Sequence, residues 1–547
     1  MSWFLCIISQ KPFLEWEIEK FLKVHPQSKN TIIKPSFYFS YDCRSELLMM
    51  KKPTEENPSL RVVMGRGYLA KSTGYSQADE RDWEKLLNFE YLPKDIDGHY
   101  VAIKIRENFV QVTNDAYGHY PVYYVKAEDY IVISNVQHFI GTLVSDKKWD
   151  YSSVSALALL KMPLEKKAYL QKISILPAGS TVTIRKNEIA VASRNLNLLA
   201  ESDADIQSYL FSLKKAYELQ LNSKDFMSIP FENNYSSRFA FSVWYHKAKK
   251  TWGLYHLQKS ELYPEKHMDQ FILNSLKIFV IPDFNDGEEV FRLYREHVLR
   301  TGLSDFPDYF ALAGNFKADE LHEINLISQH SEWLFQKEPT AKIDKIHSLL
   351  KRNAYSAFKR NYVMKNYFFR KEFYVLLLEG TKLHFAQAAK DMICTDSIYD
   401  KYHFLVHNYY MNNCSAGMAW LNDFRTFYCP GMLYSLASRS IQQRLINKKT
   451  SALSRELHIS FAEESKAFPK PKEKKSNFLE RASMNTMLFP LMTNEVGIMI
   501  EKSQDVPYYN FSSLIKIFNK AKKGNTKAVD VILKWVAFEI WREYIDG

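Results

Sequence analysis

The sequence is poor in glycine and cysteine, and it contains no long uninterrupted apolar run. Only 17 of the 547 residues are glycine, so few positions let the backbone approach a ligand closely. The five cysteines are scattered from Cys6 to Cys429 and form neither a disulfide framework nor a CxxC zinc motif. Charged residues interrupt the apolar segment 528–541 at amphipathic-helix spacing, so it does not resemble a membrane span. We therefore expect a cytoplasmic protein without membrane contact.

The charge of the chain does not single out a partner. The net charge of +11 arises from 73 basic and 62 acidic residues, which permits acidic partners but specifies none. The aromatic-rich stretch 356–380 could stack nucleic-acid bases, but its spacing fits the core face of a helix better. The basic run 466–475 has the composition of a solvated loop. We therefore expect no nucleic-acid partner.

The first 195 residues have the pattern of packed sheets with some helices. Short runs of β-branched and aromatic residues, broken by turn residues, predict strands at 99–105, 109–115, 121–127 and 130–136. The apolar start lacks a basic leader and is expected to form a first strand rather than a signal peptide. A helix is expected at 152–162 and a closing hairpin at 176–192.

The residue pattern changes after the polar stretch 200–207, which we take as a domain boundary. We expect one domain over 1–195 and a second over 205–547. The second begins with three strand-like pieces, at 226–231, 252–257 and 277–284. Helical patterns alternate with these pieces and dominate after residue 318, which predicts a parallel sheet with a large helical C-terminal part.

A distinctive pattern spans residues 95–125, DIDGHYVAIKIRENFVQVTNDAYGHYPVYYV. Its characteristic positions are Asp97, Gly98, Tyr100, Asp115, Tyr117, Gly118, Pro121, Tyr123 and Tyr124. The segments 133–143 and 173–184 (ISILPAGSTVTI) follow in order. Together they resemble the glutaminase-type domain of the asparagine synthetase family. The resemblance implies that 1–195 is a class II glutamine amidotransferase (Ntn-like) αββα sandwich.

The second half resembles the same family at a loop that normally binds the phosphates of ATP. The family carries an S-G-G-x-D-S loop after a strand, and the corresponding stretch here is PFENNYSSR, 230–238. Its cofactor-binding positions would be Glu232, Asn233, Asn234, Tyr235, Ser236 and Ser237. The resemblance implies an ATP-pyrophosphatase (adenine nucleotide alpha hydrolase-like) α/β domain that binds ATP and Mg²⁺ if activity is retained.

Two further family positions have counterparts in this half of the chain. AGNFKADEL, 313–321, resembles the family's SG-[DE]-G-x-DE segment with one extra residue, which places Gly314 at the nucleotide and Asp319 at the metal. The family also carries a C-terminal lysine that neutralises pyrophosphate, and Lys470 or Lys472 could correspond to it. The local pattern does not decide which lysine corresponds to it, or whether either does.

The loop departs from the family at the residues that carry its chemistry. Asn233 and Asn234 tolerate left-handed backbone but crowd a pyrophosphate, and Glu232 places a negative charge beside negative phosphates. Ser236 replaces the family's aspartate, so a carboxylate that could bind magnesium is absent at this position. Three interpretations remain open: a degenerate loop with little or no ATP chemistry, a diverged loop that still binds nucleotide, or an active ligase. An ordinary strand-turn-helix junction would also explain the Asn-Asn pair.

The amidotransferase half departs from the family as well. Family members that hydrolyse glutamine have a cysteine directly after the initiator methionine, whereas this chain has Ser2. A hydroxyl at the N-terminus can act as a nucleophile, but it is weaker than a thiolate. Cys6 lies inside an apolar strand pattern and is expected to be an inert core thiol. We therefore expect no glutaminase activity.

Three functional hypotheses follow from the resemblance. The first is an asparagine synthetase-like ATP-dependent amide ligase, similar to peptide (lasso-peptide) cyclases and β-lactam synthetases, in peptide-modifying metabolism with diverged or lost ligase chemistry. The second is a non-catalytic pseudoenzyme that binds a peptide or an active paralogue. The third is a glutamine-hydrolysing asparagine synthetase, against which Ser2 and the altered loop count.

Overall fold

The fold is given by a computed structural model of the 547-residue chain. The structure describes these residues: 3–25, 30–43, 48–55, 58–71, 74–107, 109–116, 118, 120–145, 147–160, 164, 168–185, 188–192, 226–230, 250–257, 276–280, 287–302, 304, 306, 324–326, 345–393 and 484–546.

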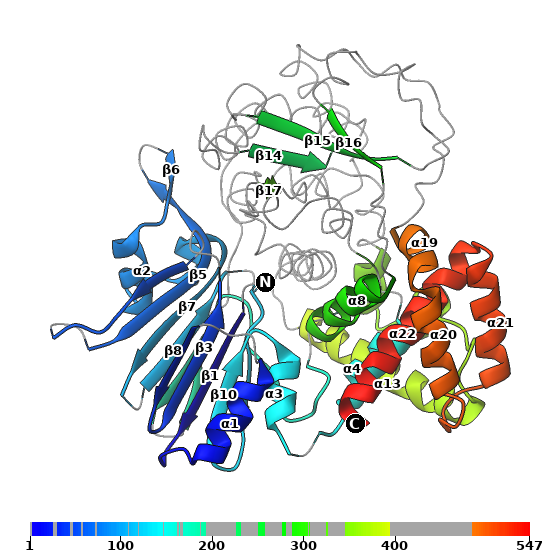
Figure 1. The fold of residues 1–547 in the computed structure, drawn as a ribbon, viewed down its shortest axis with the longest axis horizontal. Helices are drawn as coiled ribbons and strands as arrows, with labels where there is room; N and C mark the ends of the chain where they lie inside the picture. The colour runs from blue at the N-terminus through cyan, green and yellow to red at the C-terminus, as the bar shows by residue number, and fades with distance from the viewer. Residues whose placement is uncertain are drawn as a thin grey trace.

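The N-terminal part contains two antiparallel sheets (Figure 1). The first sheet has the strand order β11-β9-β10-β1-β3-β2. Its strands are β1 (Trp3–Ser9), β2 (Asn30–Lys34), β3 (Phe37–Asp42), β9 (Tyr123–Lys126), β10 (Tyr130–Ser134) and β11 (Ser174–Ile175). The second sheet has the order β13-β12-β8-β7-β5-β4, and β6 pairs with β5. Its strands are β4 (Leu48–Lys51), β5 (Leu60–Lys71), β6 (Gly74–Gln77), β7 (Asp97–Arg106), β8 (Phe109–Asn114), β12 (Thr181–Arg185) and β13 (Glu188–Ala192).

Strand alternation builds the layers of this sandwich, as β1 illustrates. Phe4 and Cys6 point into the core between the two sheets, where Val62 and Val112 of the second sheet also lie. The intervening residues of β1 point to the other face and join a core that contains helices. The helices on that face are α1 (Glu15–Val24), α3 (Gln137–Leu143) and α4 (Tyr151–Leu159). The sandwich therefore continues on this side into a helical layer.

One helix covers the outer face of the second sheet. It is α2 (Glu80–Leu87), which is followed by the short 3₁₀ helix η2 (Pro93–Asp95). Trp83 and Leu86 of α2 pack on Val63 and Tyr100 of the sheet, and the rings of Trp83 and Tyr100 meet edge to face at 4.9 Å. The layers are helix, sheet, sheet and helix, so the αββα arrangement expected for 1–195 is present in the described residues.

The third sheet is parallel and has four described strands in the order β16-β15-β14-β17. They are β14 (Phe226–Pro230), β15 (Lys250–Leu257), β16 (Leu276–Val280) and β17 (Ile324–Leu326). The three strands expected from the sequence are confirmed, and their parallel pairing is confirmed too. β17 was not anticipated, because a strand of three residues carries almost no pattern.

The described C-terminal residues are helical. The elements are α8 (Gly287–Thr301), α12 (Tyr355–Tyr362), α13 (Lys371–Ile393), α19 (Met484–Leu488), η6 (Phe489–Met492), α20 (Thr493–Lys502), α21 (Phe511–Lys522) and α22 (Thr526–Asp546). The aromatic stretch 356–380 forms core rather than a stacking surface, since Phe358, Phe368 and Phe369 are all buried. Among the described residues, no helix has the length and apolarity that crossing a membrane requires.

One hydrophobic core joins the N-terminal part to these helices. It contains Leu5 of β1, Leu157 of α4, Leu377 of α13 and Trp535 of α22. Helix α4 packs on α13 and α22. Directly after α4, Leu160 forms an isolated β-bridge with Val363, which directly follows α12. The division into 1–195 and 205–547 remains a prediction, but the described core continues across that boundary.

Helix α22 is more deeply buried than its amphipathic pattern predicts. Even Glu539 is 1% exposed. Its carboxylate accepts hydrogen bonds from the Tyr509 hydroxyl and from Arg542, whose Nη2 lies 2.7 Å from Oε1. A buried carboxylate persists only when such partners replace water, so these contacts explain how a charged residue occupies the core.

Candidate functional site

The strand order of the parallel sheet identifies one edge as a candidate ligand site. β14 is first in sequence, and its neighbours β15 and β17 lie on opposite sides of it. The order therefore reverses between β14 and β17. In open parallel sheets, such a reversal leaves a crevice at the carboxyl ends of the strands, where ligands bind. β14 ends at Pro230, so the chain leaves this strand at the candidate edge.

The residues expected to contact ATP or a metal lie outside the described part of the chain. They are Glu232, Asn233, Asn234, Tyr235, Ser236, Ser237, Gly314, Asp319 and Lys470. Ser2 is outside it as well. Pro230, two residues before Glu232, is the described position nearest to the segment 232–237. The roles of these residues stay predictions. Within the described residues, no group of three or more His, Cys, Asp or Glu side chains could hold a metal ion.

Several motif residues of the sandwich have clear structural roles. Asp115 follows β8, and its carboxylate accepts a 2.8 Å hydrogen bond from the backbone N–H of Tyr120. The carbonyl oxygen of Asp115 accepts hydrogen bonds from the backbone N–H groups of Gly118 and Gly179. Gly118 has a φ of +62°, which an L side chain rarely adopts. Asp115 and Gly118 thus build a buried turn.

A second motif segment locks onto this turn. Oδ1 of Asn114 accepts a 2.9 Å hydrogen bond from the backbone N–H of Ser180, and Nδ2 donates to the carbonyl of Pro177 at 3.0 Å. A Cβ added at Gly118 would lie 3.1 Å from the Cα of Ala178. The NDAYG and LPAGS segments are therefore the two halves of one joint between strands. The described residues of both segments therefore have a structural role at this joint.

The core between the sheets offers no activated thiol at Cys6. Cys6 is fully buried, and burial raises the pKa of its thiol far above the usual range. The expectation of an inert core cysteine is confirmed. Tyr120 also faces this core, and burial raises the pKa of its hydroxyl well above 10. Both groups remain protonated at neutral pH.

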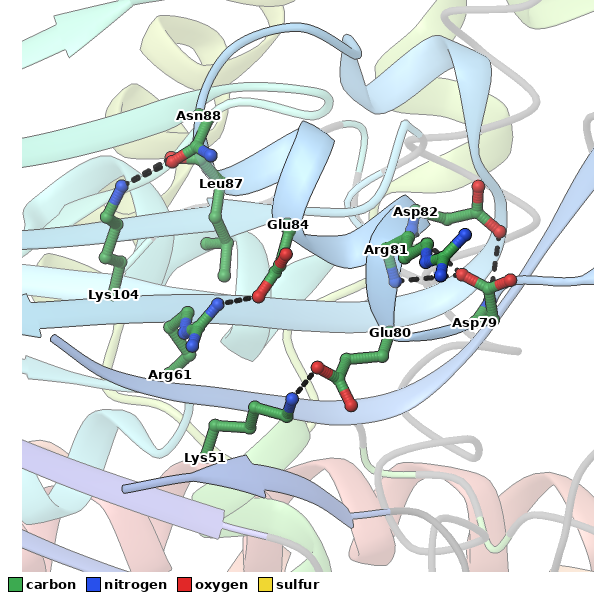
Figure 2. A network of polar contacts seen from close by, with 10 residues as sticks. All are labelled: Lys51, Arg61, Asp79, Glu80, Arg81, Asp82, Glu84, Leu87, Asn88 and Lys104. Atoms are coloured by element: carbon green, nitrogen blue, oxygen red, sulfur yellow. Dashed lines mark hydrogen bonds and ion pairs between the residues drawn. The ribbon is translucent and has the colours of Figure 1, made fainter. Parts of the chain in front are cut away.

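A network of charges lies around α2 on the outer face of the second sheet (Figure 2). Arg61 pairs with Glu84, and Lys51 pairs with Glu80. Lys104 donates a 2.6 Å hydrogen bond to Oδ1 of Asn88, and the Leu87 carbonyl at the end of the helix lies 3.5 Å from its Nζ. A lysine at the C-terminus of a helix interacts favourably with the helix dipole and so stabilises the helix. These contacts attach α2 to the sheet.

A small cavity opens at the other end of α2. It has a volume of about 220 Å³, and its walls include Met49, Gly65, Gln77, Asp79 and Trp83. Asp79 is already engaged as the N-cap of α2, where its Oδ1 accepts from the backbone N–H groups of Arg81 and Asp82. The cavity therefore contains the capping group of a helix, and its walls do not combine a nucleophile with a base.

A cluster of titratable side chains joins the sandwich to α8. His25 follows α1, His138 lies on α3, and Glu296 and Arg300 lie on α8. Arg300 donates to Glu296, and the ring of His25 lies 4.4 Å from that of Trp3. Burial lowers the pKa of His138 to about 4. The nearby Arg300 and His25 also lower this pKa, whereas Glu296 opposes the shift. The cluster was not anticipated from the sequence, where only the Glu296–Arg300 spacing of four residues gives a signal.

Glu296 carries the negative charge of this cluster. Burial opposes ionisation of its carboxyl, but the Arg300 guanidinium outweighs that effect and holds the pKa of Glu296 below its usual value. The cluster is thus an ion pair flanked by two neutral imidazoles. It connects α3 and α8, which contact each other, and it has the character of an internal polar joint.

Comparisons with known proteins place the chain in no family. No family profile matches it, and neither does any curated protein. One similar solved structure is glutamine phosphoribosylpyrophosphate (PRPP) amidotransferase from B. subtilis complexed with ADP and GMP. It has 12% identity, a TM-score of 0.23, and coverage of 42% of this chain and 61% of that one. Another, described as the allosteric regulatory enzyme of purine biosynthesis, has 12% identity, a TM-score of 0.21, and coverage of 42% and 60%. The match thus spans about three fifths of each of these proteins, at scores too low to carry an argument about function.

The joint at Gly118 predicts a stability difference between two glycine substitutions. Gly118→Ala should lower the free energy of unfolding by more than about 1–2 kcal/mol, because positive φ strain adds to contact with Ala178. Gly524→Ala is the control, since Gly524 has a φ of +80° with no atom within 4 Å of the added Cβ. Urea unfolding of both variants measures the difference. Equal losses would contradict the proposed joint.

The pKa of His138 predicts a loss of stability in mild acid. Between pH 6.5 and about 4, the unfolded chain binds a proton at this residue that the folded chain does not. Stability therefore falls as the pH falls through this window, by on the order of 1–3 kcal/mol from His138. His138→Gln should flatten the dependence of unfolding midpoint on pH between 6.5 and 4 and leave the slope above pH 7 unchanged. An unchanged slope in the acid window would show that His138 titrates normally.

Proposed function

We propose that the protein is an asparagine synthetase-like relative of the AMP-forming amide ligases, working in peptide-modifying metabolism with diverged or lost ligase chemistry. The observation that carries the proposal is the order of the folds along the chain. A four-layer αββα sandwich precedes a parallel sheet whose strand order reverses beside β14. This reversal supports the alignment of the segment after Pro230 with a phosphate loop, because phosphate loops follow a strand at such an edge.

The residues of that segment do not fit a magnesium pyrophosphate. Glu232 repels phosphate, Asn233 and Asn234 add bulk where the backbone would have to converge on an anion, and Ser236 is neutral. Adenylation of a carboxylate depends on metal and cationic groups that stabilise the leaving pyrophosphate. We therefore assign no ligase step to these residues. Any retained activity would be ATP-dependent formation of a carbon–nitrogen bond.

A pseudoenzyme is the second form of the same proposal. Its partner would be a peptide or an active paralogue, held by a fold that keeps the crevice without the phosphate chemistry. The inert Cys6 thiol is in keeping with it, since burial removes this sulfur from nucleophilic chemistry. A cytoplasmic location is part of the proposal, as are the absence of a nucleic-acid partner and of membrane contact.

The proposal predicts that the natural protein does not bind ATP and that a repaired loop does. The repaired variant carries Glu232→Ser, Asn233→Gly, Asn234→Gly and Ser236→Asp. Isothermal titration calorimetry should give no saturable heat for the natural protein up to about 1 mM ATP, whereas the repaired variant should bind more tightly than this limit when Mg²⁺ is present. Titration of the repaired variant without Mg²⁺ is the control for metal dependence.

The other outcomes of this titration are equally informative. Magnesium-dependent binding by the natural protein would overturn the loss of nucleotide chemistry and would justify a search for the carboxylate substrate. Absence of binding by both proteins would remove the support for aligning residues 230–238 with a phosphate loop.

A further inference from the structure

Helix α21 and the turn that follows it present a surface on which every charge is positive. Residues 506–529 contain five lysines and no aspartate, glutamate or arginine. Helix α21 packs on α20 and α22 and lies at the outer edge of the helical part (Figure 1). The basic surface consists of five exposed lysines, Lys516, Lys520, Lys522, Lys523 and Lys527.

The described part of the chain does not neutralise this basic surface. None of the five lysines forms an ion pair with a described residue. Positions 516, 520 and 523 are four and three residues apart, so they share one side of the helix over about 10 Å. Like charges at this spacing repel each other and destabilise the helix, and a bound anion would relieve that repulsion.

The helix dipoles explain only part of the basic surface. Lys520, Lys522 and Lys523 lie at the C-terminal end of α21, where a cation interacts favourably with the dipole. Lys516 lies in the middle of α21, away from this effect. Lys527 is the second residue of α22, at a helix N-terminus, where the dipole favours negative charge. The positions of Lys516 and Lys527 therefore require another explanation.

The neutral residues between the lysines indicate which kind of anion fits. The exposed ones on α21 are Ser512, Ile515 and Asn519. Nucleic-acid surfaces combine basic groups with arginines that read bases or with exposed aromatic rings, and residues 511–527, all described, expose neither. A helix on a membrane surface needs a broad apolar face, whereas Ile515 is the one large apolar side chain that α21 exposes. Carboxylates require only point charges such as lysine ammonium groups.

From these observations we infer that the basic surface binds an acidic segment of another polypeptide, through ion pairs between its carboxylates and the lysines. Alternate side chains of an extended peptide lie on the same side about 6.7 Å apart. Lys516 and Lys520 are about 6 Å apart along the helix axis, so a Glu-x-Glu-x-Glu segment can pair with Lys516, Lys520 and Lys523. The inference does not depend on the proposed function, because it does not involve the sheet edge beside β14.

Fluorescence anisotropy with the full chain tests this binding. The probe is a labelled peptide of alternating Glu and Ser, and a peptide of alternating Gln and Ser is its control. The Glu peptide should bind saturably and more weakly as salt is added, because salt screens exposed ion pairs. The Gln peptide should not bind, since it lacks the carboxylates.

Removal of the lysines should weaken binding of the Glu peptide. The triple variant Lys516→Gln, Lys520→Gln and Lys523→Gln should raise the dissociation constant about tenfold or more, because each lost ion pair contributes a part of the affinity. All three positions are exposed, so the variant should fold, and its thermal unfolding midpoint checks this.

A matched variant on α13 separates the basic surface from the net charge of the chain. Lys371→Gln, Lys382→Gln and Lys390→Gln remove three exposed lysines from another helix and should change the dissociation constant by less than about twofold. The inference is overturned if the Glu peptide does not bind, or if the two triple variants weaken its binding equally. It is overturned as well if a labelled oligonucleotide or anionic vesicles bind the basic surface more tightly than the Glu peptide does.

Discussion

The close approach of α4 and α13 is the contact on which the helical part and the sandwich both depend. Gly380 lies where α13 meets α4, and a Cβ added there would overlap the Ser155 hydroxyl and lie 2.6 Å from the Ser155 Cβ. Only a glycine lets the two helices approach this closely. Because α4 also contacts α22, this contact extends one apolar core from β1 to the last helix of the chain. The sandwich and the C-terminal helices are therefore energetically linked.

The polar groups that hold this fold together can be distinguished from the sheet edge that could bind a ligand. Asp115 and Gly118 build a turn, and the His25, His138, Glu296 and Arg300 cluster joins α3 to α8. The carboxyl edge of the parallel sheet beside β14 is the candidate for ligand binding, and the sequence after Pro230 carries residues unsuited to phosphate. A parallel sheet with an altered sequence directly after β14 is what the proposal of diverged or lost ligase chemistry requires.

Short runs of β-branched and aromatic residues made several strands of the sandwich predictable from the sequence, and three strands of the parallel sheet were predicted as well. β7 and β8 lie within a residue or two of their expected bounds, and Cys6 is as inert as its apolar strand implied. Long-range contacts were not predictable. Glu539 interrupts an apolar helix pattern, and only Tyr509, 30 residues away, and Arg542 explain its burial. The role of Gly380 was equally unpredictable, because no pattern near it in sequence indicates its contact with Ser155.

Hydrogen–deuterium exchange of Gly380→Ala is the most direct test of the shared core. Overpacking at this contact should cost about 1–3 kcal/mol, and it should lower protection together in α4, α13 and α22. Gly497→Ala is the matched control, because its Cβ would meet Phe518 at an ordinary 3.8 Å. Joint loss of protection in the three helices is the predicted result. Loss confined to α13, with α4 exchanging as before, would contradict a single core spanning the sandwich and the C-terminal helices.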